Sequence, residues 1–276
     1  MKITDAQVHI WAASTPERPW PKRAAPHRPV PFTAEDLIRE MNEAGIDRAV
    51  VIPPSFEGDR NDLALAAAAA NPGRIGIMGR LDPNADDARE QVEHWREQPG
   101  MLGMRFTFSQ PSAQELLASG SLEWVWEAAE KNGIPLMVNA SHSQIALLER
   151  LATQFPMLRL TVDHLGLISG QKDEEAFSRL DQLLELAKYD NVAVKASALP
   201  GYSTDTYPYS SLHPYIRRVY DAFGAQRMFW GTDITRMPIS YRQMVTLFTE
   251  EIPWLTDEDK EWIMGRGICE WLGWPE

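Results

Sequence analysis

Six polar residues stand at or near the ends of short apolar segments, where their side chains could meet. They are His9, Arg105, Asn139, His164, Lys195 and Asp233. Imidazole and carboxylate groups transfer protons or bind metals, while guanidinium and ammonium groups bind anions. A lone histidine or aspartate is more often structural. Six such residues at corresponding positions predict an active site for a small anionic molecule.

The elements that must position these residues are eight short apolar segments, each followed by an amphipathic stretch. The predicted strands cover residues 2–8, 48–52, 75–79, 102–106, 135–139, 158–162, 191–195 and 228–231. This alternation is typical of an α/β fold with a parallel sheet, and eight units close into a (β/α)8 TIM barrel. The length of 276 residues fits one barrel domain over residues 1–276. The six polar residues would then share the barrel's C-terminal mouth.

Helix signals support the count of units. Thr33 is a capping residue followed by early acids, and Gly45 ends that helix. Further helices are predicted over residues 85–97, 122–132, 174–188 and 212–223. An additional C-terminal helix over residues 256–272 would cover the outside of the barrel.

The segment after the first strand is too rich in proline for a helix or a central strand. It contains Pro16, Pro19, Pro21, Pro26, Pro29 and Pro31. A long first loop of a barrel commonly builds or covers the active site. We therefore interpret it as a lid or pocket wall, with a simple surface excursion as the open alternative.

Composition narrows the classes of function. The formal net charge of −12 without a basic cluster argues against nucleic-acid binding. No apolar run is long enough to span a bilayer, and the first residues do not form a signal peptide, so we expect no membrane association and a cytoplasmic location. The single cysteine, Cys269, is expected to be a buried, inert thiol.

Four segments together resemble the landmarks of the amidohydrolase superfamily, amidohydrolase-2 branch. They are Asp5-Ala6-Gln7-Val8-His9, Val162-Asp163-His164-Leu165-Gly166, Trp230-Gly231-Thr232-Asp233 and Ile263-Met264-Gly265-Arg266-Gly267. They follow the family's order along essentially the whole chain. The resemblance implies a TIM-barrel hydrolase with its site at the strand ends.

Two departures from the family pattern concern metal binding. Gln7 stands where the first of two histidines is usual, and Asn139 stands where the fifth strand usually ends in histidine. Catalytic zinc normally takes three good protein ligands, and an amide oxygen is a poor substitute for imidazole. We therefore predict no metal and no other cofactor. A zinc or manganese ion held by His9 and Asp233, with His142 as a substitute ligand, remains the alternative.

The branch also includes hydrolases resembling 2-pyrone-4,6-dicarboxylate lactonase, which work without a metal. This resemblance favours a lactonase opening a small carboxylated or sugar-acid lactone, with Asp233 as general base and His9 and His164 polarising the carbonyl. Arg105 would clamp a substrate carboxylate, with an ion pair inside the barrel as its alternative role. Further substrate contacts are assigned to Gln7, Asn139, Lys195, His142 and Tyr202.

Two other functions remain open. One is a metal-dependent hydrolase or decarboxylase of the same superfamily, and the other is a non-catalytic barrel that binds a small acid. The geometry that the lactonase requires is testable: His9, Arg105, His164 and Asp233 should share one pocket, with His164 within about 10 Å of Asp233.

Three further expectations concern other parts of the chain. We expect the protein to form a homodimer. We also expect Arg80 to pair with Asp82 in a structural role, and His27 to have no catalytic role.

Overall fold

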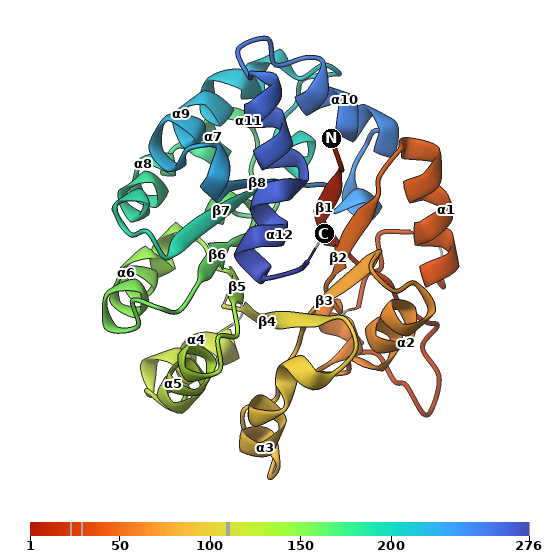
Figure 1. Ribbon diagram of the computed structural model, residues 1–276, viewed down its shortest axis with the longest axis vertical. Helices are drawn as coiled ribbons and strands as arrows, with labels where there is room; N and C mark the ends of the chain where they lie inside the picture. The colour runs from red at the N-terminus through yellow and green to blue at the C-terminus, as the bar shows by residue number, and fades with distance from the viewer. Residues whose placement is uncertain (23, 29, 109–110, 276) are drawn as a thin grey trace.

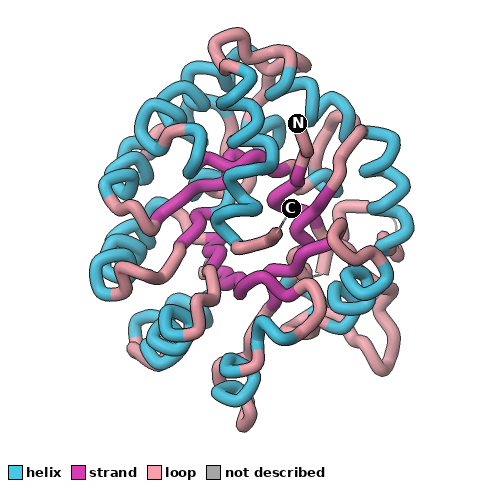
Figure 2. Tube along the Cα trace, viewed as in Figure 1, coloured by secondary structure: helices cyan, strands magenta, loops and turns pink. Residues whose placement is uncertain are grey.

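The computed structural model describes residues 1–22, 24–28, 30–108 and 111–275 and shows eight parallel strands in a nearly closed barrel (Figures 1 and 2). The strands pair in chain order. They are β1 (Thr4–Val8), β2 (Arg48–Val51), β3 (Ile75–Gly79), β4 (Met101–Thr107), β5 (Leu136–Asn139), β6 (Leu160–Val162), β7 (Val192–Ser197) and β8 (Met228–Gly231). At the junction of β8 and β1, the backbone N–H of Asp233 donates to the carbonyl of Gln7 at 2.7 Å. The predicted (β/α)8 barrel is confirmed.

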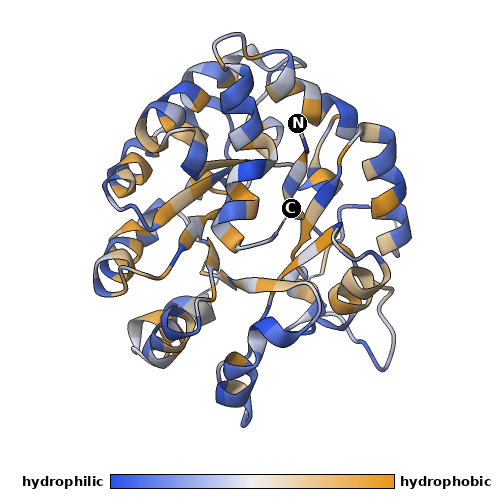
Figure 3. Cartoon of the chain, viewed as in Figure 1, coloured by the Kyte–Doolittle hydropathy of each residue, from blue (hydrophilic) through white to orange (hydrophobic). Residues whose placement is uncertain are grey.

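Helices surround the barrel, and Figure 3 shows that they mix polar and apolar segments while the strands are mainly apolar or neutral. They are α1 (Ala34–Ala44), α2 (Asp62–Ala70), α3 (Ala88–Glu93), α4 (Pro111–Ala118), α5 (Glu123–Lys131), α6 (Ile145–Gln154), α7 (Asp173–Phe177), α8 (Leu180–Leu184), α9 (His213–Phe223), α10 (Tyr241–Thr249), α11 (Asp257–Glu261) and α12 (Gly267–Leu272). Among the described residues, none of these helices has the length and apolar composition needed to cross a bilayer.

Local signals explain where several helices begin and end. The side chain of Thr33 caps α1 by accepting from the N–H of Asp36, and Gly45 ends it in the left-handed conformation at φ 79°. The helix predicted over residues 85–97 is shorter, with a separate 3₁₀ turn at Trp95–Glu97. The segment 174–188 is divided into α7, α8 and a 3₁₀ turn. The hydroxyl of Ser178 bonds the carbonyl of Glu175 at 2.8 Å between α7 and α8.

The C-terminal segment does not cover the outside of the barrel, which corrects the sequence prediction. In Figure 1, α12 crosses the barrel axis. The buried side chains of Ile268 and Leu272 pack with Ala6 and Met78 of the strands. Gly265 lies against the start of β1, where an added Cβ would be 2.4 Å from the carbonyl oxygen of Lys2. The segment closes the N-terminal end because its apolar residues fill the opening there.

The proline-rich loop between β1 and α1 lies over the other end of the barrel. Its two ends are joined by an antiparallel bridge, in which Trp11 N donates to Phe32 O at 2.9 Å and Phe32 N to Trp11 O at 3.1 Å. Arg18 ties the loop to the following segment by an ion pair with Glu57 at 2.6 Å. Pro21, Ala24, Ala25 and His27 line a cavity, as expected of a pocket wall. Pro29, one of the prolines of this loop, lies outside the described residues.

Candidate active site

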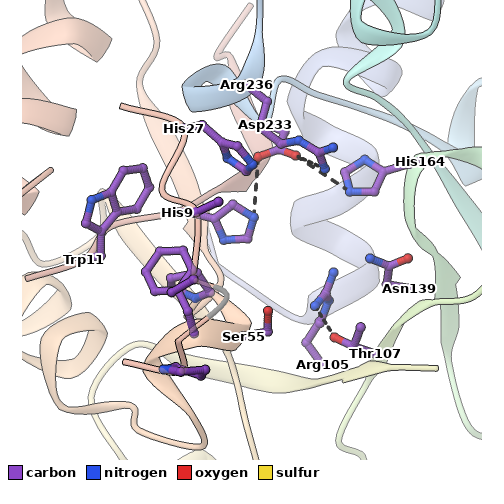
Figure 4. A pocket seen from close by; sticks show the side chains of 15 residues that line it. His9, Trp11, His27, Ser55, Arg105, Thr107, Asn139, His164, Asp233 and Arg236 are labelled. Carbon is purple, nitrogen blue, oxygen red and sulfur yellow. Dashed lines mark hydrogen bonds and ion pairs between the residues drawn. The ribbon is translucent and has the colours of Figure 1, made fainter. Parts of the chain in front are cut away.

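A cavity of about 710 Å³ opens at the C-terminal mouth of the barrel, beneath the proline-rich loop (Figure 4). It is lined by His9, Trp11, Pro21, Ala24, Ala25, His27, Pro54, Ser55, Phe56, Arg105, Thr107, Asn139, His164, Asp233 and Arg236. His164 Nε2 lies 4.0 Å from Asp233 Oδ2. The predicted convergence of His9, Arg105, His164 and Asp233 on one pocket is therefore confirmed, and Asn139 also reaches the wall.

Asp233 follows β8 in an unusual backbone conformation that neighbouring residues hold in place. Its φ is 50°, a left-handed value that is unfavourable for a residue with a side chain. Asp5 fixes the preceding residue, because its carboxylate accepts from Thr232 N at 2.9 Å and from the Thr232 hydroxyl. The Tyr241 hydroxyl also donates to Asp5, at 2.7 Å. Burial raises the pKa of Asp5 to about 6. This buried network joins β1 to β8 and aims Asp233 at the cavity.

The tautomer of His9 follows from its neighbours. An ammonium group can only donate, so Lys195 requires the oxygen of the Gln7 amide to face it. The Gln7 nitrogen then donates to His9 Nε2 at 3.2 Å, and His9 Nδ1 donates to the carbonyl of Ile52 at 2.6 Å. Burial lowers the pKa of His9. His9 is therefore neutral, with its proton on Nδ1 and its Nε2 lone pair accepting from the Gln7 amide.

The carboxylate of Asp233 carries a buried oxygen that no described residue satisfies. Oδ1 has no hydrogen-bond partner there and lies 3.4 Å from His9 Nε2, while Oδ2 lies 3.5 Å from Arg236 Nη1. Burial raises the pKa of Asp233, but electrostatic interactions with the neighbouring His9, His164 and Arg236 outweigh it, so the net pKa is below its ordinary value. An ionised carboxylate oxygen without a hydrogen-bond donor thus faces the cavity beside His9. A water molecule there could donate one hydrogen to it.

His164 lies on the other side of Asp233. Its Nδ1 is 2.8 Å from the hydroxyl of Ser197, at the end of β7. The nearby carboxylate favours a proton on Nε2, so the Ser197 hydroxyl donates to Nδ1. Burial, the largest cause, lowers the pKa of His164 to about 4. His164 therefore offers a neutral N–H to the cavity.

These pKa values predict the acid limb of the pH profile. We expect kcat/KM to stay high on acidification through pH 6.5, because His164 stays neutral and Asp233 stays ionised there, and to fall only below the ordinary pKa of an aspartate, where Asp233 gains its proton. The profile should be measured with a substrate that does not itself titrate, and circular dichroism should show folded protein at each pH. A fall centred near pH 6.5 would contradict the assignment.

Arg105 forms the ion pair considered from the sequence and also lines the cavity. Its Nε pairs with Asp163 Oδ2 at 3.1 Å and its Nη1 donates to the Thr107 hydroxyl, while the side chain is 6% exposed and lines the cavity. Burial raises the pKa of Asp163, but Lys195 and Arg105 lower it further, to about 2. The ion pair holds the guanidinium in place at the cavity wall.

Four of the expected substrate contacts do not line the cavity. Lys195 is fully buried and pairs with Asp163 at 2.7 Å, and Gln7 lies beneath His9, so both support the site from inside the barrel. Tyr202 is 5% exposed and packed in the core. His142 lines a separate small cavity with Arg179. Their assignment to direct substrate contact is therefore corrected.

A family model described as amidohydrolase matches residues 4–267 of this chain. The chain belongs to the amidohydrolase family. It is a hydrolase whose core and site both lie within the matched residues.

Two relatives of known name are similar over most of this hydrolase. An L-fucono-1,5-lactonase of Burkholderia ambifaria is 25% identical over 237 residues, covering 83% of this chain and 79% of the relative. A 4-sulfomuconolactone hydrolase of Rhizobium radiobacter is 21% identical, covering 83% and 74%. A solved structure described as a 2-pyrone-4,6-dicarboxylic acid hydrolase of Pseudomonas putida has a TM-score of 0.80 at 17% identity, covering 99% of this chain and 97% of that one. That likeness supports the fold.

The donor set of this hydrolase does not fit a catalytic metal. Among the described residues, no three histidine, cysteine, aspartate or glutamate side chains are arranged to hold one. The His9 Nε2 lone pair is engaged by the Gln7 amide at 3.2 Å, and Lys195 prevents that amide from turning its oxygen toward the cavity.

The sequence did not place two ionisable residues, His27 and Arg236, in the cavity. Figure 4 shows His27 and Arg236 beside the Asp233 carboxylate. Arg236 follows Asp233 by three residues in a 3₁₀ turn, and its other terminal nitrogen donates to Ser169 at 2.9 Å. His27 belongs to the proline-rich loop, and that loop's position was the only available signal for it.

Proposed function

We propose that this hydrolase is a lactonase that opens a small carboxylated or sugar-acid lactone with water activated by Asp233. The observation that carries the proposal is the buried Asp233 Oδ1, unpaired among the described residues and 3.4 Å from His9 Nε2. The names of the two relatives, both lactone hydrolases, support the substrate class.

The proposed reaction follows from the tautomers. A water molecule donates one hydrogen to Asp233 Oδ1, which leaves an oxygen lone pair free to be directed at the lactone carbonyl. As the oxygen attacks, its proton passes to Asp233, and the His164 N–H stabilises the negative charge that develops on the carbonyl oxygen. The ring C–O bond then breaks, and Asp233 returns the proton to the departing alkoxide. His9 does not polarise the carbonyl in this reaction, because its neutral Nε2 has no hydrogen to donate.

Arg105 is proposed to hold the substrate's carboxylate. Replacing Arg105 by methionine should raise KM for a carboxylated lactone by about 10- to 100-fold, because a hydrogen bond to a charged group contributes about 1.5–3 kcal/mol. The fall in kcat should be smaller. The variant should fold, because the buried Asp163 still has its ion pair with Lys195, 2.7 Å away. A neutral lactone serves as the control, and an unchanged KM for the anionic lactone would contradict the assignment.

The proposal is tested by following acid release from a lactone panel. We expect the purified protein to open at least one of L-fucono-1,5-lactone, 4-sulfomuconolactone and 2-pyrone-4,6-dicarboxylate, which are the lactones that name its relatives and a similar structure. No turnover of any lactone or ester, together with binding of a small acid, would instead favour a non-catalytic barrel.

A further inference from the structure

A second, smaller cavity adjoins the active site. It has a volume of about 180 Å³ and shares Arg105 and Thr107 with the main cavity. Its other lining residues are Asp59, Arg80, Leu81, Asp82, Pro83, Asn84, Phe106, Phe108, Leu116 and Leu122. Two guanidinium groups and two carboxylates therefore line this recess together with apolar side chains, and we call it the side cavity.

Arg80 is buried there without an adequate partner. Its side chain is 12% exposed, and Nε is buried with no hydrogen bond from the described residues. Nη1 reaches only the carbonyl of Pro53 at 3.4 Å, and the nearest carboxylate, Asp59, is 3.8 Å from Nε and half exposed. The expected pair with Asp82 is absent from the ion pairs of the described residues; the Asp82 carboxylate instead accepts from Asn84 N at 2.9 Å.

The position of Arg80 is nevertheless well defined. Asn61 holds its backbone on both sides, accepting from Arg80 N at 2.8 Å and donating to Arg80 O at 2.9 Å. Burial and, secondarily, the charge of Arg105 lower the pKa of Arg80 to about 10, so it remains charged at neutral pH. A buried charge without a good partner destabilises a fold, which leaves the placement of Arg80 unexplained by stability.

The carboxylate beside Arg105 does not supply the partner that Arg80 lacks. Asp163 is the buried carboxylate next to Arg105, and it also pairs with Lys195 at 2.7 Å. One negative charge thus serves two cations, while Arg80 has only the distant Asp59. An anionic group entering the side cavity would supply the hydrogen-bond acceptor that Arg80 Nε lacks among the described residues.

We propose that the side cavity binds an oxyanionic substituent of the substrate, a carboxylate or a sulfonate, between Arg80 and Arg105. This deepens the proposed function and rests on it, since it restricts the substrate to lactones with such a group. The lactone carbonyl would lie near Asp233 while the substituent extends past Arg105 into the recess. Arg80 is then a specificity-determining residue.

Calorimetric binding of benzoate, benzenesulfonate and neutral benzamide tests this without turnover. We expect the two anions to bind the wild-type protein, and the Arg80→Met variant to bind them about 10-fold or more weakly, as for a lost hydrogen bond to a charged group. Arg80→Lys should bind them with intermediate affinity. Benzamide binding should not change in any variant. A preference for benzoate or benzenesulfonate identifies which oxyanion the recess accepts.

Two comparisons separate this role from an architectural one. Arg39→Met removes an exposed guanidinium of α1, and it should leave anion binding unchanged. Arg80→Met should melt at or above the wild-type temperature if the charge serves a ligand. Unchanged anion binding in Arg80→Met, failure of that variant to fold, or no anion binding by the wild type would overturn the proposal. These outcomes do not depend on lactone hydrolysis, whose absence would overturn only the proposed reaction.

Discussion

Replacing Asp233 by asparagine should lower kcat for lactone opening by about 10²- to 10⁴-fold, the range of general acid–base catalysis. Asparagine keeps the size of the side chain but cannot take the proton from water. KM should change much less, because Arg105 and the cavity walls remain. An anionic substrate could even bind more tightly once the negative charge at the site is removed.

Steady-state kinetics on the wild type and this variant measure the effect. Asp181→Asn, the same chemical change at an exposed residue of α8, is the matched control and should leave kcat unchanged. Near-normal kcat in the Asp233 variant would make this carboxylate structural, and the proposed mechanism would then be abandoned.

Replacing Lys195 by methionine should lower the free energy of unfolding by about 3 kcal/mol, the lower end of the range for breaking a buried ion pair. Lys195 is fully buried and bonds Asp163, the Gln7 amide and the carbonyl of Ala6. Without it, Asp163 keeps only Arg105, and the Gln7 amide loses the partner that fixes its orientation toward His9.

Denaturant unfolding with the wild-type m value gives this free energy. Lys188→Met removes an exposed lysine that pairs with Glu149, and it should cause no measurable change. A Lys195 variant as stable as the wild type would show that the buried pair contributes nothing to the fold.

The barrel could be predicted because short apolar segments and amphipathic stretches alternate along the whole sequence. The predicted limits of β3 and β8 match those of the structure, since each is a short apolar run with a clear end. The order of the strands then placed His9, His164 and Asp233 at one mouth. Parallel strands bring their C-terminal ends to the same edge, so these positions follow from topology.

The role of Lys195 could not be predicted, because the predicted end of its strand lies two residues before the end in the structure, and this changes where the side chain lies. β7 continues to Ser197, so Ser197 reaches His164 while Lys195 remains inside the barrel. β4 likewise continues to Thr107, which places Arg105 beside Asp163. Arg236 lies in a turn and His27 in a loop. The spacing of apolar residues does not predict the conformation of such segments.

The central claim is that the Asp233 carboxylate activates water without a metal ion, and turnover after metal removal tests it most directly. Protein purified without chelator should be dialysed against one, its zinc and manganese content measured, and its kcat on a lactone compared before and after dialysis. We predict an unchanged kcat at a metal content well below one ion per chain. A loss of kcat that zinc or manganese restores would contradict the claim.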